Sequence, residues 1–210
     1  MIANIVFQFL LEGGPVMWPI LTCALVAVAV VGERAFWWLR ESFKRDVCRR
    51  KELLAALEHS DVEKGQRLAQ GSEDPVIRMI RQSLDHEHTS IPVALEMAAG
   101  IELQRAGRFL NVMDTLVTLA PLLGLLGTVT GLMRAFLKVG NAELSVMAVT
   151  GGIGEALIAT ACGLLIAIVS LVPLNYFSGR LARLQFELET AASNVEVLAI
   201  AGKLNREEVE

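Results

Sequence analysis

The sequence has little charge and few of the residues that bind metals or form disulfides. Of its 210 residues, 20% are charged, 6% are aromatic, and cysteine and histidine occur 3 times each. Soluble domains carry about 25% charged and about 45–50% apolar residues, so the apolar fraction of 53% argues against a soluble monomer. The low charge argues against disorder. A net charge of −4 excludes a generally basic nucleic-acid-binding protein, and we expect no nucleic-acid partner.

The cysteines and histidines do not form a metal-binding or redox pattern. The cysteines are odd in number and scattered, without a CxxC pair: Cys23, Cys48 and Cys162. We expect free thiols, two of them packed among apolar residues. The pair His86 and His88 lies in a charged stretch without nearby cysteine, where a solvated helix end is favoured over a metal site. No metal and no other cofactor is expected.

Three long apolar runs are the main feature of the sequence. They are Gly13–Gly32, Thr115–Met133 and Leu144–Gly179, and only the third contains a charged residue, Glu155. A helix needs about 20 apolar residues to cross a hydrocarbon core about 30 Å thick. We therefore predict an all-α integral membrane protein with three transmembrane helices and long cytoplasmic helical extensions.

The basic residues predict the orientation of these spans. No basic residue precedes Arg34, so the first run lacks the charged start of a cleaved signal peptide. Most of the 19 basic residues lie in the stretch 33–108 or in the tail from Arg180, and only Arg134 and Lys138 lie on the opposite side. By the positive-inside rule, the N-terminus is outside, and the long loop and the tail are cytoplasmic.

We expect one domain over residues 1–210. Its predicted parts are an outer interfacial helix at 1–12, spans at 15–38, 113–138 and 147–174, a cytoplasmic helical loop at 39–112, an outer loop at 139–146 and a cytoplasmic tail helix at 175–210. Within the loop, helical segments are predicted at 41–58 and, after an Asp-Pro start, at about 75–84. Apart from Gly100 and Gly107, no helix breaker lies between Val93 and Pro121, so the second span should grow out of a longer cytoplasmic helix.

The tail carries an apolar heptad pattern. Its apolar residues recur at alternating steps of four and three from Phe177 to Leu198, which is typical of a coiled-coil seam. This seam either packs against the loop helices of the same chain or forms a bundle between subunits, and the pattern favours neither. Pro173, near the end of the third span, predicts a kink.

Small residues recur at steps of three and four in the second and third runs, whereas the first run is lined with Leu, Val and Ile. In lipid, small side chains let helix backbones approach one another. We therefore expect the second and third spans to be closely packed inner helices and the first to lie toward lipid. The expected packing glycines are Gly124, Gly127, Gly131, Gly152 and Gly163.

The polar residues of the spans are the candidate functional residues. Thr128 and Thr160 are predicted near mid-depth, and Glu155 lies five residues from Thr160. An acidic residue inside a span costs about 2.5–3.5 kcal/mol, so it usually faces a cavity or a partner. A structural hydrogen bond between helices is the alternative. Five residues correspond to about 140° around a helix, so Glu155 and Thr160 do not lie on one narrow line. Either several helices surround a wide lumen that both residues border, or one of the two faces a helix interface.

Two segments resemble motifs of a known family. The segment 120–131, APLLGLLGTVTG, resembles the second-span motif of the ExbB/TolQ branch of the MotA/TolQ/ExbB proton-channel family. The segment 154–164, GEALIATACGL, resembles its third-span motif. The similarity holds residue by residue from about Asn111 to Tyr176. Thr130 departs from it, standing where a bulky residue is common, and the four spans of MotA-type proteins make that branch a poorer match.

The resemblance implies a homo-oligomeric ring, a pentamer, around the single-span helix of an ExbD/TolR-like partner. Thr128 and Thr160 would line the proton pathway, and Glu155 would be the acidic residue of the third span. The protein would lie in the bacterial inner membrane with a periplasmic N-terminus and a cytoplasmic C-terminus. The proton motive force would then drive a TonB-like or TolA-like protein that works on the outer membrane.

These features bear on three functions. A proton-channel subunit that powers TonB-dependent outer-membrane transport is favoured, with a TolQ-like role in Tol-Pal envelope maintenance as its variant. A passive membrane scaffold that assembles through the tail is the second function. The third, an intramembrane enzyme, is disfavoured because the runs contain no histidine and only one carboxylate well inside. We therefore expect no enzyme activity.

Overall fold

The computed structural model describes residues 14–59, 61–84, 90–139 and 146–207. In these ranges all regular secondary structure is helical. The chain divides into two compact units. We call Met1–Arg34 with Phe109–Phe177 the span unit, and Ala35–Arg108 with Ser178–Glu210 the polar unit. The predicted interfacial helix at 1–12 lies outside the described residues.

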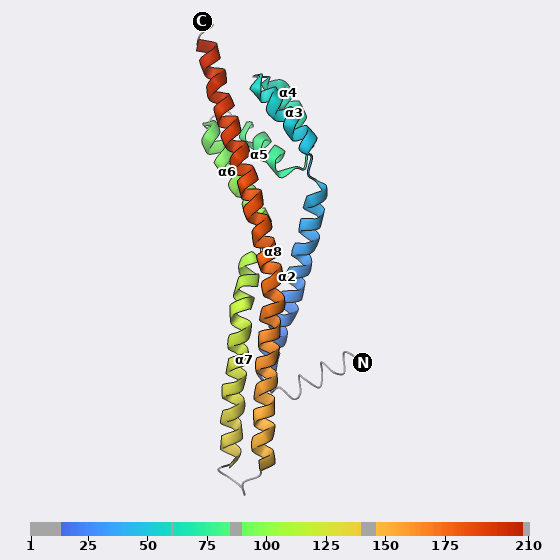
Figure 1. Cartoon of the computed structure of the whole chain (residues 1–210), viewed down its shortest axis with the longest axis vertical. Helices are drawn as coiled ribbons and strands as arrows, with labels where there is room; N and C mark the ends of the chain where they lie inside the picture. The colour runs from blue at the N-terminus through green and yellow to red at the C-terminus, as the bar shows by residue number, and fades with distance from the viewer. Residues whose placement is uncertain (1–13, 60, 85–89, 140–145, 208–210) are drawn as a thin grey trace. The chain divides into compact units, whose positions relative to one another are not determined.

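Three helices are long and apolar enough to cross a membrane, which confirms the three predicted spans. They are α2 (Met17–Phe43), α7 (Leu110–Val139) and α8 (Val146–Glu207), seen in Figure 1. Helix α8 continues through Pro173, so the third span and the tail, which were predicted as separate parts, form one helix. Helix α7 likewise continues through Pro121.

The prediction of an uninterrupted helix leading into the second span is wrong. Helix α6 (Ile91–Ala106) ends at Gly107, and α7 begins only at Leu110. Phe109 between them has a φ of 64°, a left-handed conformation that does not continue a right-handed helix. The guanidinium of Arg34 lies 5.7 Å from the centre of the Phe109 ring, a cation–π contact that helps to hold the break in place.

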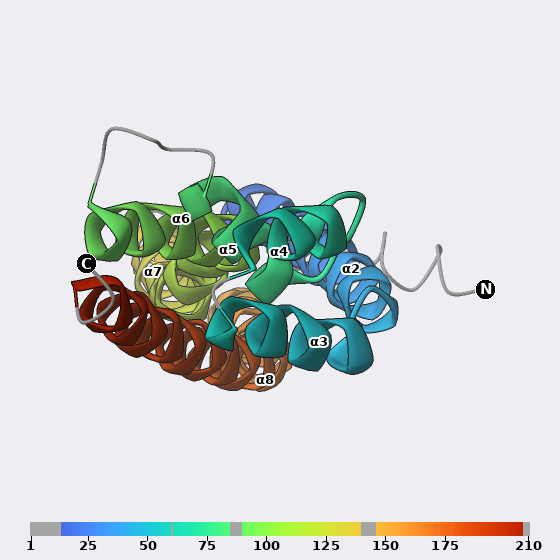
Figure 2. The ribbon, with the colours of Figure 1, turned by 90° about the horizontal axis from the view of Figure 1, so that it is seen from above.

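Three of the short helices in the polar unit begin with a side-chain cap. Helices α3 (Val47–Glu58), α4 (Val62–Ala69) and α5 (Pro75–Leu84) follow one another, and Figure 2 shows α5 beside α6. An aspartate side chain accepts a backbone N–H at each helix start, and the three are Asp46, Asp61 and Asp74. These caps satisfy donors that a helix start leaves unpaired. Leu53, Ile77 and Leu95 are fully buried in the core.

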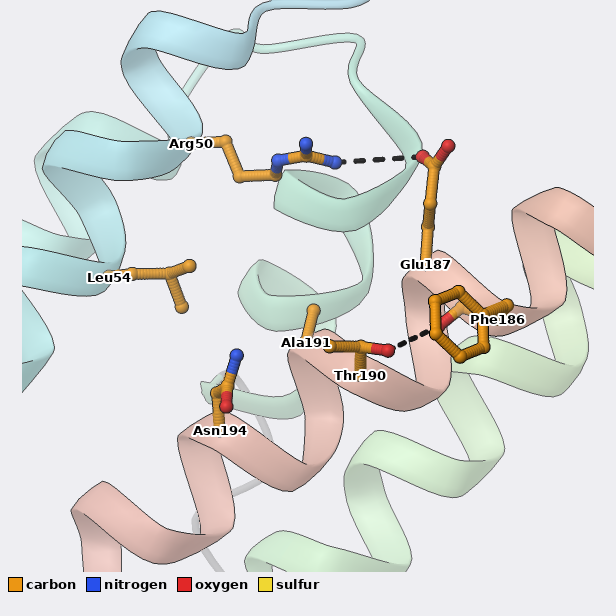
Figure 3. A pocket seen from close by; sticks show the side chains of 7 residues that line it. All are labelled: Arg50, Leu54, Phe186, Glu187, Thr190, Ala191 and Asn194. Carbon is orange, nitrogen blue, oxygen red and sulfur yellow. Dashed lines mark hydrogen bonds and ion pairs between the residues drawn. The ribbon is translucent and has the colours of Figure 1, made fainter.

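The heptad seam of the tail is used inside the chain. Leu184, Leu188 and Val195 are buried within the described structure. The side chain of Leu181 lies next to Gly107, at the end of α6. Figure 3 shows α3 facing α8 across a pocket of about 210 Å³, with Arg50 directed toward Glu187 at 3.6 Å. Of the two arrangements that the pattern left open, the structure has the intrachain one.

A buried ion-pair network connects α2, α5 and α6 in the polar unit. Arg78 Nη2 lies 2.8 Å from Glu41 Oε1 and 2.5 Å from Glu102 Oε2. The side chains of Glu41 and Glu102 are only 7% and 2% exposed. Burial of Arg78 acts to lower its pKa, but its hydrogen bonds and attraction to Glu102 and Glu41 raise that pKa above the usual value overall.

Candidate functional site

Helices α7 and α8 approach each other through glycine and alanine. A Cβ atom added at Gly127 would lie 2.5 Å from a Cβ on α8, a distance that side chains do not reach. Each of the five glycines singled out in the sequence lies against a small residue or backbone of the other helix: Gly124 on Thr160, Gly127 on Ala159, Gly131 on Ala156, Gly152 on Ala135 and Gly163 on Ala120. The pairing is antiparallel and leaves backbone atoms of the two helices in direct contact.

Helix α2 covers one side of this pair. Met17 and Ile20 are buried against Ala159, whereas Trp18 and Leu25 on the same helix are exposed. The first span therefore packs on the inner helices along one face and is exposed along another. The prediction that it lies toward lipid describes only the second face.

Thr160 makes a hydrogen bond between the helices. Its hydroxyl donates to the backbone carbonyl of Gly124 at 2.8 Å, and the side chain is partly buried. A threonine in a helix commonly bonds its own helix three or four residues back. Here Gly124 has no side chain to cover its carbonyl, so the α8 hydroxyl can reach that oxygen.

Thr128 is placed differently from Thr160. Its hydroxyl donates to the carbonyl of Leu125 in its own helix at 2.6 Å, and its side chain is partly exposed. Thr160 lies level with Gly124, one turn away from Thr128, which is about 6 Å along the axis. The two hydroxyls therefore lie about one turn apart and each has a backbone partner.

Glu155 faces α7 in this chain. Its Oε1 lies 2.8 Å from Nη1 of Arg134, and the two side chains are 25% and 39% exposed. The Oε1 atom is covered and has no well-aligned hydrogen bond among the described residues, so the contact is an ion pair rather than a linear bond. Arg134 also donates through Nε to the Thr130 carbonyl. The structure thus brings Glu155 to Arg134 and not to Thr160.

Gly14 closes over this ion pair. Its φ is +71°, and a Cβ there would overlap Oε1 of Glu155 and lie 3.1 Å from Nη2 of Arg134. Only glycine meets both conditions, the left-handed backbone and the missing side chain. The chain entering α2 therefore covers the carboxyl group from one side.

Two participants in this arrangement were not identified from the sequence. In the sequence, Arg134 serves only as a marker of membrane orientation. In the antiparallel pairing of α7 and α8, Gly131 contacts Ala156. This register brings residues 134 and 155 to nearly the same level, so knowledge of it would have indicated the pairing of Arg134 with Glu155. Gly14 has no local signal, since its approach to Glu155 depends on the path of the chain in space. Among the described residues, no cluster of three or more His, Cys, Asp or Glu could hold a metal ion.

Comparison with known proteins gives consistent matches. The profile of the MotA/TolQ/ExbB proton channel family matches residues 68–190, a segment that contains Thr128, Glu155 and Thr160. An ExbB-like biopolymer transport protein of Synechocystis sp., numbered 1, is 39% identical over 170 residues, which cover 77% of this chain and 66% of that protein. A second ExbB-like protein from that organism, numbered 3, is 35% identical over 184 residues, which cover 85% of this chain and 87% of that protein. The biopolymer transport protein ExbB of Xanthomonas campestris is 41% identical over 86 residues, which is 40% of this chain and 34% of that protein.

Proposed function

Because this chain belongs to the MotA/TolQ/ExbB proton channel family, on its ExbB-like branch, we propose that it is the channel subunit of an energy-coupling motor. The family consists of channel and transport subunits rather than enzymes. With three apolar helices, the chain is a multi-pass membrane protein. In the proposal it uses the proton motive force across the bacterial inner membrane, with its N-terminus in the periplasm and its C-terminus in the cytoplasm.

One observation carries the proposal: Glu155 is the only charged residue between Leu144 and Gly179. A carboxyl group inside an apolar helix can pass a proton to water or to a second carboxyl group. Arg134 and Gly14 shield its Oε1 atom. Proton transfer at that oxygen therefore requires the ion pair to open, and Thr128 and Thr160 supply hydroxyls along the route.

A lumen requires several copies, since three helices in one copy enclose no pore. The proposal is a homo-pentamer around an ExbD/TolR-like single-span helix, which carries the second carboxyl group. Gly151 and Gly154 on α8 have open space where a Cβ would stand. This free edge leaves room for close approach of a neighbouring helix within the bilayer.

The mechanical work proposed is TonB-dependent outer-membrane transport through a TonB-like protein. The similar proteins of Synechocystis and Xanthomonas are named biopolymer transport proteins, which favours transport. The passive scaffold has less support, because the chain's own packing already buries the tail seam that suggested it.

The test is proton flux through the subunit and its partner in lipid vesicles with an imposed pH gradient. Glu155→Gln should lower the flux by roughly 100-fold, as expected when a proton-transfer group is removed. Thr160→Val should lower it less. Thr130→Val is the matched control, because the proposal gives the Thr130 hydroxyl, which bonds the Leu126 carbonyl, no part in the route; this variant should leave the flux unchanged.

The same vesicles separate the channel from the scaffold. Full flux in the Glu155→Gln, Thr160→Val double variant would contradict the channel, even if the complex still assembles. Subunit counting of the purified complex by mass photometry should give five copies, and a monomer would contradict the ring.

A further inference from the structure

A small arginine-lined cavity lies inside the polar unit, between the end of α2 and α8. Its volume is about 210 Å³. The lining residues are Ser42, Arg45, Arg180, Arg183 and Glu187. The lining therefore carries three positively charged guanidinium groups, one neutral hydroxyl and one negatively charged carboxylate.

Arg180 is held in position by two contacts. Its Nη2 donates to Oγ of Ser42 at 2.7 Å, and its guanidinium lies 5.2 Å from the centre of the Trp38 ring. Trp38 is 4% exposed, so it forms a fixed platform under the guanidinium. Neither contact neutralises the charge of Arg180, because both partners are uncharged.

The one carboxylate of the cavity is already shared. Glu187 lies 2.8 Å from Arg45 and 3.6 Å from Arg50, the second contact being drawn in Figure 3. Arg183 makes no ion pair or hydrogen bond with another residue in the described part of the chain. Arg180 and Arg183 thus present two positive charges that no acidic side chain of the cavity compensates. A planar guanidinium fork matches the oxygens of a phosphate group.

The cavity borders an apolar face of α2. Phe36, Leu39 and Phe43 are exposed and recur at i, i+3 and i+7, so they form one stripe. Ser42 stands on the helix surface next to that stripe. Arg180 is the first charged residue of α8 after Glu155, which puts it at the end of the apolar segment. Exposed apolar side chains beside basic ones are typical of a segment at the level of lipid headgroups.

From this arrangement we propose that the cavity binds the phosphodiester of an anionic phospholipid headgroup. Arg180 and Arg183 bind the phosphate oxygens, and the exposed stripe of α2 contacts the start of the acyl chains. This site is separate from Glu155 and does not depend on proton conduction.

The experiment is calorimetric titration of the full chain in neutral detergent with dihexanoyl phosphatidylglycerol. Dihexanoyl phosphatidylcholine and inorganic phosphate are titrated in parallel. Phosphatidylglycerol should bind best. Arg183→Gln should weaken its binding by roughly 5-fold and Arg180→Gln with Arg183→Gln by roughly 25-fold, since each basic group near a lipid surface contributes about that factor.

The matched control is Lys64→Gln with Arg67→Gln, which removes two exposed positive charges on α4 and should bind as the unchanged chain does. Equal loss in this control would show a general charge effect and overturn the site. Equal affinity for inorganic phosphate would identify a soluble anion as the ligand and overturn the lipid assignment. Unchanged binding in Arg183→Gln, the variant least able to disturb folding, would overturn it too.

Discussion

The span unit and the polar unit are held together by different interactions. In the span unit, glycines let α7 and α8 meet at backbone distance, with one hydroxyl–carbonyl bond from Thr160 and one ion pair from Arg134 to Glu155. In the polar unit, aspartate caps and the Arg78 network connect short helices over a core of fully buried aliphatic side chains.

The difference follows from the solvent around each unit. Between helices in lipid the hydrophobic effect provides no drive, because lipid tails are as apolar as leucine, so close packing must hold the helices. In water, burial of Leu53 or Ile77 stabilises the fold directly, and the buried Arg78 network connects α2, α5 and α6. The span unit should therefore be sensitive to added volume and the polar unit to lost charge.

The largest effect is expected in the polar unit. Arg78→Ala leaves Glu41 and Glu102 buried without their shared partner; Glu102 keeps Arg105 at 3.1 Å and Glu41 keeps Lys44 at 3.8 Å. Removing one member of a buried ion pair costs about 3–5 kcal/mol. The free energy of unfolding, measured by urea titration with circular dichroism in detergent, should fall by about 3 kcal/mol at the lower end of that range.

The control for this variant is Arg67→Ala, which breaks an exposed pair with Glu63. Exposed pairs contribute about 0–1 kcal/mol. If both variants lost the same stability, the polar unit would not depend on its buried charges, and the contrast between the two units would fail.

The second effect tests added volume in the span unit. Gly163→Ala would push a methyl group into the Ala120 carbonyl, so the helices must separate. Overpacking of this kind costs about 1–3 kcal/mol. Gly179→Ala on the same helix meets open space and should be neutral or stabilising by about 0.5–1 kcal/mol, because alanine favours a helix over glycine. In a dodecyl sulfate titration, the alanine variant at the helix contact should unfold at a lower dodecyl sulfate fraction than the unchanged chain, and the alanine variant in open space at an equal or higher one. Equal stability of the two variants would contradict close packing.

The sequence predicted features that depend on local patterns. The long apolar runs indicated the spans. The periodic small residues indicated a close approach of α7 and α8, and the glycines of the two helices do lie in close contact. The break at Phe109 was missed because a left-handed phenylalanine is set by its surroundings, here Arg34, and not by propensity. The pairing of Glu155 with Arg134 required the register of two helices, which a single run does not contain.

A smaller effect distinguishes bonds between helices from bonds within one helix. Thr160→Val removes the hydroxyl that donates to Gly124 on α7, whereas Thr130→Val removes one that donates to its own helix. Hydrogen bonds between membrane helices contribute about 0.6 kcal/mol on average. The dodecyl sulfate midpoint should fall for Thr160→Val and recover with Thr160→Ser, which restores the hydroxyl. Equal midpoints for the two valine variants would show that the interhelical bond adds nothing.

The smallest effect belongs to the surface of the polar unit. A hydrogen bond from Lys44, at 2.9 Å, and the charge of that lysine hold the pKa of the Glu73 carboxyl below its ordinary value of 4.5. A lowered pKa in the folded state means that the contact stabilises fully above pH 4.5 and is lost as the pH falls through the folded pKa. Glu73→Gln should therefore flatten the dependence of the melting temperature on pH below that value. Lys44→Gln should flatten it equally, and a full pH dependence in that variant would contradict the pairing. The change is small because water and salt screen an exposed pair, which is why the same kind of contact matters far more at Arg78.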